Sequence, residues 1–554
     1  MRPLKTTGAA LLVAALATTI AACGSGGSGA SAGSGTASTA SATAVAGESE
    51  GTPKNGGSLT FALNAGWDTL DPAVSAFTFA RQIMLFMFDP LLRHDPKTGK
   101  IVPGLVKSYE VSDDGKAVTL ELPSGVKFHD GTACDADAVV SSLERVTDPD
   151  LKSPWASLLA PVDAISAEGP TTVKITLKTP SAPFLDALTQ VNLAPVSPAA
   201  VEKEGTDFGA HPVGTGPFKF DKQTAGQSVT VVRNPDYAWA ASFHDSTDPA
   251  HLDSITIRNV AEDATRMSLL NTGQIDIAYQ ALASQLPTLK ADPKFRVILA
   301  PRSGMPRSLV LNTKMFPFSD PKLREAMTYA VNKQQIVDTA WGGSGTIAGS
   351  ILTPGMPGFS AAVAKAAATY NPGKAKQILA DSGWKPGADG VLAKNGKKLS
   401  FSFGTQPGTT FQLQGQLLQS QLKEIGIDLK LSSKEQAAVL ADLQGAKAPF
   451  TDMLFAATDP DVMYTVLASD SIGKAWNGAA YSNPEMDDLL TRARAETDPA
   501  ARASMYEQAQ QLVARDNPYV PFYNISVPYA TTARVHGLLF DGQAFWDGYS
   551  AWVN

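Results

Sequence analysis

Cysteine is nearly absent from this chain, which has two such residues, Cys23 and Cys134, among 554. A framework of several disulfides is therefore excluded, and burial of apolar surface has to stabilise the fold. Cys134 is expected to be a small buried packing residue rather than a nucleophile. Beyond the first 22 residues no apolar run approaches 18 residues, so no membrane-spanning helix is expected in the body of the chain.

An excess of positive charge is also missing. The formal net charge is −7 and no basic stripe stands out, which argues against nucleic acid as a partner. With 44% hydrophobic and 18% charged residues, the composition is that of an ordinary globular protein. The length is enough for two or three domain-sized cores.

Catalytic motifs are missing as well. The chain has no G-x-S-x-G elbow, no H-E-x-x-H pair and no P-loop. Its six histidines are scattered, and the closest pair, His244 and His251, lies in loop-like sequence. The sequence therefore predicts no enzymatic activity, no cofactor and no metal site, and it favours a binding protein.

The amino terminus has the pattern of a secretory signal. Arg2 and Lys5 precede an apolar run from residue 9 to residue 20, and the run ends in Ile20-Ala21-Ala22-Cys23, which resembles the bacterial lipobox. We expect a signal peptide at 1–22 and acylation of Cys23, which would hold the protein on the extracytoplasmic face of the membrane. Residues 23–54 are then a flexible Gly/Ser/Ala linker spanning about 30–35 Å.

The remaining sequence alternates strand and helix patterns, which predicts a mixed α/β fold. Period-two alternation predicts strands at 58–64, 118–122, 173–177, 255–257 and 427–431, and a return strand is expected at 126–128. Capping residues predict helices after Asp135, Asp320, Asn371, Asn483 and Asp498, four of them followed by proline. A further helix is expected from Leu413 to Ile425, ended by Gly426. Open α/β sheets are expected between 312 and 530.

An ordered series of motifs then resembles one family, the extracellular solute-binding proteins of peptide-type ABC importers (family 5, with oligopeptide, dipeptide and nickel binders). The matching segments are Phe88-Asp89-Pro90-Leu91-Leu92, Thr98-Gly99-Lys100-Ile101-Val102-Pro103-Gly104-Leu105, Gly125-Val126-Lys127-Phe128-His129-Asp130-Gly131-Thr132, Gly214-Thr215-Gly216-Pro217-Phe218 and Leu323-Arg324-Glu325-Ala326-Met327. The resemblance covers nearly everything from residue 57 onward. It implies a periplasmic-binding-protein-like fold (type II, cluster C) with two hinged lobes and an additional α+β domain.

By this resemblance, lobe I comprises 55–88, 205–312 and 529–554, the additional domain 89–204, and lobe II 313–528. The protein is expected to be a monomer that closes over a small polar solute. It would deliver the solute to an ABC permease, whose ATPase subunits are separate chains. Three alternatives stay open: an anchored extracellular hydrolase, a sensor or adhesin that kept the fold, and a receptor for a metal or metal chelate.

The resemblance also implies which residues contact the ligand. In peptide-binding relatives the ligand lies between two backbone stretches, which correspond here to residues 73–77 and 455–461. The first stretch consists of Ala73, Val74, Ser75, Ala76 and Phe77. The second contains Ala456 where relatives place a carboxylate for the ligand's amine, so a substitute anchor is sought at Asp459 or Asp461.

A free-amine peptide is consequently a weaker expectation than a blocked or cyclic peptide, an oligosaccharide or an opine. Aromatic side chains suit sugar rings and apolar side chains, and the candidates are Trp67, Phe455, Tyr464, Trp476 and Trp546. Arg307 is a candidate partner for a ligand carboxylate; the alternative role for it is a surface or inter-lobe salt bridge.

Overall fold

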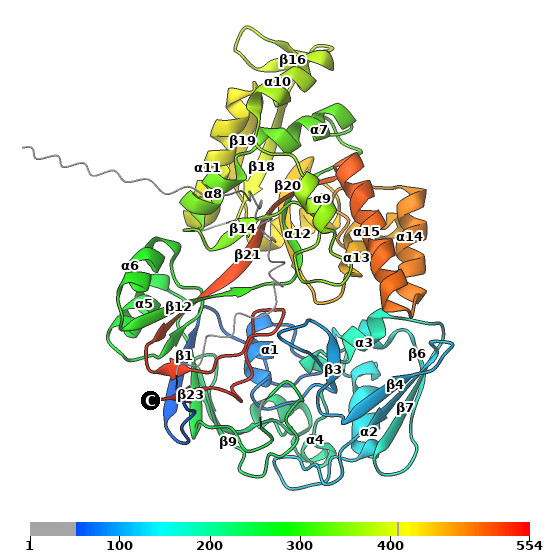
Figure 1. Cartoon of the computed structure of the whole chain (residues 1–554), viewed down its shortest axis with the longest axis vertical. Helices are drawn as coiled ribbons and strands as arrows, with labels where there is room; N and C mark the ends of the chain where they lie inside the picture. Colours follow the sequence, from blue (N-terminus) through cyan, green and yellow to red (C-terminus); the bar gives the residue numbers. More distant parts are fainter. Residues whose placement is uncertain (1–50, 245, 407–408) are drawn as a thin grey trace, which may run out of the picture. The chain divides into compact units, whose positions relative to one another are not determined.

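The computed structural model describes residues 51–244, 246–406 and 409–554 (Figure 1). Its largest sheet is the backbone of both lobes and has the path β20-β13-β21-β11-β1-β10-β9-β8, with β12 and β14 also paired to β21. In this path order, followed by the two side branches, the strands are Phe450–Ala456, Gly304–Leu311, Tyr519–Thr532, Ile277–Ala278, Ser58–Leu63, Ser254–Asn259, Ser228–Arg233, Phe218–Thr224, Phe295–Pro301 and Gly345–Ile347.

Lobe I is built on the β1 end of this sheet. β1 and β10 pair in parallel, and the inward residues Phe61 and Ile257 are completely buried. Trp546 packs into the same core against Phe61 and Phe86, with ring centroids 5.4 and 4.9 Å apart. The lobe is completed by α1 (Thr78–Met84), α5 (Asp263–Asn271), α6 (Leu286–Ala291), β22 (Val535–His536) and β23 (Trp552–Val553). The strands predicted at 58–64 and 255–257 are confirmed.

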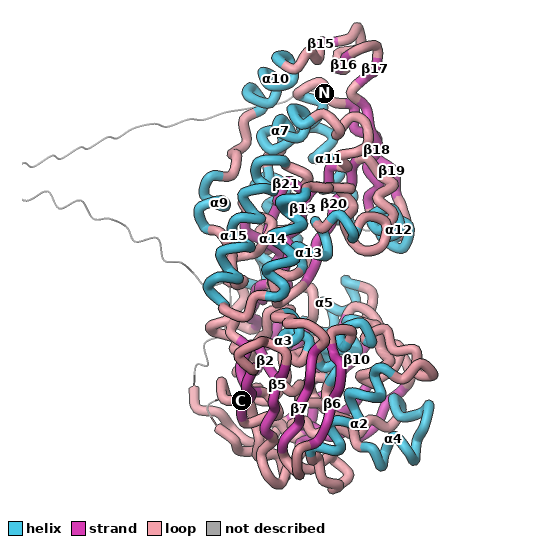
Figure 2. Tube along the Cα trace, turned by 90° about the vertical axis from the view of Figure 1, so that its right-hand side faces the viewer, coloured by secondary structure: helices cyan, strands magenta, loops and turns pink. Residues whose placement is uncertain are grey.

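The additional domain is a four-stranded antiparallel sheet in the order β4-β5-β7-β6, with α2 lying beside it (Figure 2). The domain's elements are β4 (Ser108–Val111), β5 (Ala117–Glu121), β6 (Val162–Ala167), β7 (Thr172–Leu177), β2 (Leu92–His94), β3 (Ile101–Pro103), α2 (Ala136–Thr147), α3 (Pro183–Ala187) and α4 (Pro198–Glu204). As predicted, the Asp135 side chain caps α2 by accepting the Ala138 N–H, and Cys134 is buried. The return strand expected at 126–128 is wrong: the segment makes one isolated bridge, Lys127 with Ala133, because the turn brings the chain back at once.

Lobe II carries most of the helices. α7 (Pro321–Ala330), α10 (Pro372–Asp381), α14 (Pro484–Ala495) and α15 (Pro499–Asp516) begin at the four predicted caps, and each cap side chain accepts a backbone N–H. α11 (Thr409–Glu424) connects the parallel, paired strands β18 (Ser400–Thr405) and β19 (Asp428–Ser433) along the chain. Gly426, at φ +83°, follows the helix. The other elements are α8 (Lys333–Ala340), α9 (Ala361–Ala366), α12 (Gln436–Gln444), α13 (Val462–Leu467) and the hairpin strands β15 (Lys385–Pro386), β16 (Leu392–Lys394) and β17 (Lys397–Lys398).

Two strand connections carry the chain between the lobes. The first runs from β12 into β13, and the second is β21, the long strand that Figure 1 draws in red and orange. Residues 519–523 of β21 pair with β13, and residues 526–532 pair with β12. Leu309 and Leu311 of β13 pack in the same buried cluster as Phe318 and Met327, so this strand adds to the lobe II core although the sequence division ended lobe I at 312. The division into domains stays a prediction.

Within these described ranges, none of the helices combines the length and apolar character that crossing a bilayer requires. Cys23 and the expected signal peptide lie outside the described residues, as does the expected linker except for its last residues, 51–54.

Candidate ligand cleft between the lobes

A cavity of about 710 Å³ lies where the two lobes meet. Lobe I contributes side chains from the segments that follow β1 and β11 and from the start of α5, and lobe II contributes side chains from β20, α11 and α12. The residues that the argument uses are Asn64, Gln280, Arg302, Arg307, Trp341, Phe411, Asp452, Phe455, Ala456 and Trp476. A cavity of this size with mixed polar and aromatic lining is typical of a site for a small solute.

A buried ion pair forms the lobe II wall of the cavity. The Arg307 guanidinium donates to Asp452 at 2.6 Å, and each side chain is 6% exposed. The Gln414 amide donates to the same carboxylate oxygen at 2.8 Å. Burial lowers the pKa of Arg307, but the charge and hydrogen bond of Asp452 together with the nearby Tyr523 hydroxyl outweigh that effect, and the pKa is raised.

Aromatic rings hold this ion pair from the sides. The Arg307 guanidinium lies 5.6 Å from the Trp341 ring centroid and 5.2 Å from that of Phe411, distances that allow cation–π attraction. The Trp341 indole N–H and the Tyr523 hydroxyl both donate to the Gln414 side-chain oxygen, at 3.1 and 3.0 Å. The wall is therefore a connected network in which the guanidinium of Arg307 already balances the charge of Asp452.

A close contact between two backbone segments, the start of β13 and the end of β20, positions the apolar part of the cavity wall. Gly304 at the start of β13 has φ +127°, and a Cβ there would lie 2.1 Å from the Phe455 carbonyl oxygen. Glycine thus allows β13 and the end of β20 to touch. Phe455 and Trp476 then meet edge to face with centroids 5.9 Å apart, and Ala456 lines the cavity beside them.

The two carboxylates considered as amine anchors already have partners. Arg502 holds Asp459 with two hydrogen bonds of 2.6 and 2.7 Å. Asp461 lies 3.3 Å from Arg494, and the Tyr506 hydroxyl donates to it at 3.4 Å. Burial raises the pKa of Asp461 to about 7. Neither residue lines the cavity as described.

Comparison with known proteins places this geometry in a family. The model of the middle region of bacterial extracellular solute-binding proteins, family 5, matches residues 100–475. The chain belongs to this family. The glutathione-binding proteins GsiB of Shigella dysenteriae and Escherichia coli K12 are 31% and 30% identical over 472 residues, which is 84% of this chain and 88% of theirs.

Solved structures give the same fold. The periplasmic binding protein DppA of Helicobacter pylori, in complex with the peptide STSA, superposes with a TM-score of 0.73 at 25% identity, covering 90% of this chain and 98% of that one. AgaA of A. tumefaciens, in complex with agropinic acid, gives 0.70 at 28% identity, covering 90% and 99%. The two-lobe type II fold is confirmed. Like its relatives, the chain is a solute-binding protein and not an enzyme.

In this family-5 protein, four of the residues singled out from sequence come together at the cavity: Arg307, Phe455, Ala456 and Trp476. Trp67 and Trp546 lie instead in the buried core of lobe I, 8% and 2% exposed. Tyr464 lies outside the described lining of the cavity, under the Arg494 guanidinium at 4.1 Å. The ligand-binding roles of all these residues stay predictions.

The segment 73–77 forms a turn before α1 and is not part of the lining described for the cavity. Its carbonyl groups at Ala73 and Ser75 already accept hydrogen bonds from Ser153 and from the Trp155 indole. Val74 is half-buried, while Ala76 and Phe77 are exposed, Phe77 by 53%. Phe77 is therefore the side chain of this segment with the most surface left for a solute.

Sequence reasoning missed Trp341, Phe411, Gln280 and Arg302, which also line the cavity. Each of these residues lies at or near the end of a helix or strand, and the residues around it in space come from distant parts of the sequence. No local sequence pattern therefore marks it as a cavity residue. Arg302 had one available signal: it follows a strand directly and precedes Gly304, which is typical of a sharp connection.

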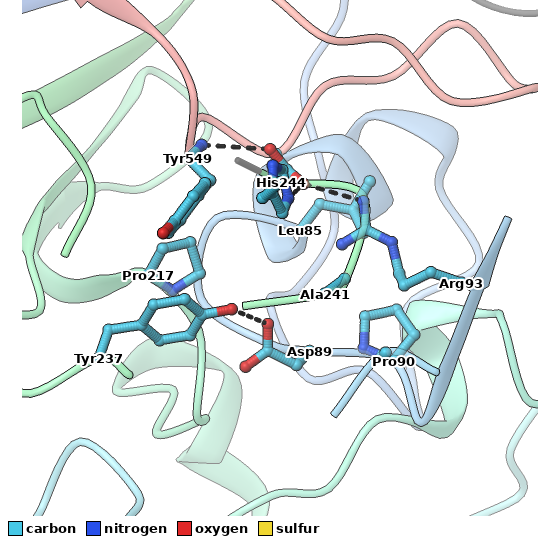
Figure 3. A pocket seen from close by; sticks show the side chains of 11 residues that line it. Leu85, Asp89, Pro90, Arg93, Pro217, Tyr237, Ala241, His244 and Tyr549 are labelled. Atoms are coloured by element: carbon cyan, nitrogen blue, oxygen red, sulfur yellow. Dashed lines mark hydrogen bonds and ion pairs between the residues drawn. The ribbon is translucent and has the colours of Figure 1, made fainter. Parts of the chain in front are cut away.

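A second, much smaller void of about 10 Å³ lies between lobe I, β2 and the C-terminal segment (Figure 3). Arg93 and His244 both contact one carboxylate oxygen of Asp547, at 2.9 and 3.2 Å, while the Tyr237 hydroxyl donates to Asp89 at 3.0 Å. The volume suits about one water molecule rather than a solute. This cluster joins the additional domain to the end of the chain.

Proposed function

We propose that the protein captures a peptide-type solute in the cavity between its lobes and presents it to the separate permease and ATPase subunits of an ABC importer. The observation that carries this proposal is the cavity of about 710 Å³ lined from both lobes. Closure of the lobes excludes water, and a solute that contacts both lobes favours the closed state by its differential affinity.

The relatives support the class of solute. GsiB is named for glutathione, DppA was solved with a four-residue peptide and AgaA with agropinic acid, an opine. Amide groups of Asn64 and Gln280 on one side, with aromatic rings of Phe411 and Trp476 on the other, suit the backbone and side chains of such molecules. Oligosaccharides fit the same groups less specifically.

The test is to purify the full chain from its host without denaturation and to identify any co-purified small molecule by mass spectrometry. Thermal unfolding with glutathione, short peptides, opines and oligosaccharides follows, because a ligand selective for the folded state raises Tm by mass action. We expect a peptide-type solute in both measurements. A co-purified sugar, or no response to any peptide-type compound, would contradict the proposal.

Delivery and anchoring are tested in cells. Deleting the gene is expected to abolish uptake of the identified solute, and normal uptake would favour a sensor or adhesin instead. We also propose that acylated Cys23 holds the protein on the extracytoplasmic membrane face. A Cys23→Ser variant is expected to appear in the soluble fraction and to lose incorporation of labelled fatty acid, whereas unchanged labelling would refute the anchor.

A further inference from the structure

Two arginines near the lobe I side of the cavity form no ion pair with an acidic side chain. Arg302 lines the cavity, and Arg81 on α1 lies close enough for the two charges to interact. In the described part of the chain no carboxylate forms an ion pair with either one, and the Nε–H of each is buried without a hydrogen-bond partner. Orphaned donors of this kind are costly unless something else satisfies them.

The hydrogen bonds of Arg81 go to neutral groups, and the nearby acids Asp541 and Asp186 act on its charge without forming an ion pair. Its guanidinium donates to the neutral amide oxygens of Gln190 and Gln543, at 2.7 and 2.8 Å. Burial lowers the pKa of Arg81, the charge of Asp541 opposes this, and the neighbouring charge of Arg302 lowers the pKa further. One oxygen of Asp541 accepts the backbone N–H groups of Gln543 and Phe545, at 2.8 Å each, so this acid also stabilises the turn in which it lies.

Every acid of the cavity, by contrast, has a cation. Asp452 is paired with Arg307 at 2.6 Å, and Asp263 with Arg266 at 2.6 Å. Among the described lining residues this leaves Arg302 as the charge without a counterion. A cavity with one guanidinium that lacks an ion pair, and with both of its carboxylates paired to arginines, favours an anion over an ammonium group.

We propose that the solute of this protein is a peptide-like anion, bound through a carboxylate to Arg302 with Arg81 beside it, and that a free amino group contributes nothing to its binding. The planar guanidinium matches a carboxylate with two parallel hydrogen bonds, and the unpaired Nε–H supplies one of the donors. This inference rests on the proposed function and narrows its solute class.

The experiment uses the full chain and four pools of tripeptides with the same sequences and different ends: unmodified, N-acetylated, C-amidated, and both. Retained peptides are quantified by affinity selection and mass spectrometry. Amidation is expected to reduce retention at least about tenfold, because a charge-assisted hydrogen bond is lost. Acetylation is expected to change retention less than about threefold, since no carboxylate is left unpaired.

Variants then assign the effect to the arginine. Arg302→Gln is expected to remove the difference between acid and amide pools, Arg81→Gln to reduce it, and Arg302→Lys to keep part of it because the charge remains. The matched control is Arg492→Gln, which removes one positive charge from a side chain 54% exposed on α14, paired with Asp488. That control should bind like the unmodified protein. Circular dichroism and Tm without ligand show that each variant folds.

The outcomes separate the two proposals. Equal retention of amidated and acid peptides, or a large loss on acetylation, overturns this inference and leaves the proposed function standing. An unchanged acid preference in a folded Arg302→Gln variant overturns the role of Arg302. Retention of none of the four pools contradicts the proposed function, and this inference fails with it.

Discussion

The ion pair of Arg307 and Asp452 offers a test of how the lobe II wall is stabilised. Replacing Asp452 by Asn removes the negative charge that lies 2.6 Å from the Arg307 guanidinium, whose side chain is 6% exposed, and leaves a neutral amide in its place. Removing one partner of a buried pair costs about 3–5 kcal/mol, because the remaining charge is uncompensated. The Trp341 and Phe411 rings continue to attract the guanidinium and limit the loss, so we expect about 3 kcal/mol.

Urea unfolding followed by circular dichroism measures this change. For a folding unit of about 200 residues, a loss of about 3 kcal/mol in the free energy of unfolding corresponds to a decrease in Tm of about 6–12 °C. The matched control is Asp488→Asn, which breaks the exposed pair of Asp488 and Arg492 and should cost less than about 0.5 kcal/mol. A double variant, Arg307→Met with Asp452→Leu, should recover at least half of the loss because no buried charge remains.

The reasoning would be refuted if Asp452→Asn destabilised the protein no more than Asp488→Asn does. It would also be refuted if the double variant were less stable than the single one. In either case the cavity wall would be able to solvate Arg307, which would make that guanidinium available to a ligand carboxylate as the sequence suggested.

Other predictions concern Gly304, one histidine and the buried thiol. Gly304→Ala should cost about 2–3 kcal/mol in urea unfolding, because its Cβ meets the Phe455 carbonyl oxygen; Gly131→Ala, at φ +87° with open space around it, should cost clearly less. Burial lowers the pKa of His129 to about 4, so about 3 kcal/mol of stability, fully present above pH 6.5, should disappear as pH falls toward 4; an imidazole titrating near 6.5 by NMR would contradict this. Cys134 should react with iodoacetamide only after unfolding, since burial raises its thiol pKa; rapid labelling of the native protein would contradict it.

Helix caps and the inward faces of strands could be predicted from the sequence because they depend on residues that are close together in the chain. Asp320 and Asn371 cap their helices through backbone N–H groups within the first turn, and proline at the first helical position marks each start. Strand alternation placed Val118 and Leu120 inward for the same reason, and the ordered motifs identified the family. The expected strand at 126–128 failed because pairing needs a partner strand, which periodicity does not supply.

The cavity itself depended on the tertiary structure. Arg307 finds Asp452 across 145 residues, and Gln414 of a third element completes the same network. The residues next to Arg307 in sequence do not show whether its guanidinium has a buried acidic partner or is available to a ligand. The residues next to Arg302 do not show that it forms no ion pair. The sequence by itself determined the family, the caps and the inward faces of the elements. Only the packing of β13, β20 and β21 against each other decided which charges meet, because long-range contacts depend on topology rather than on local pattern.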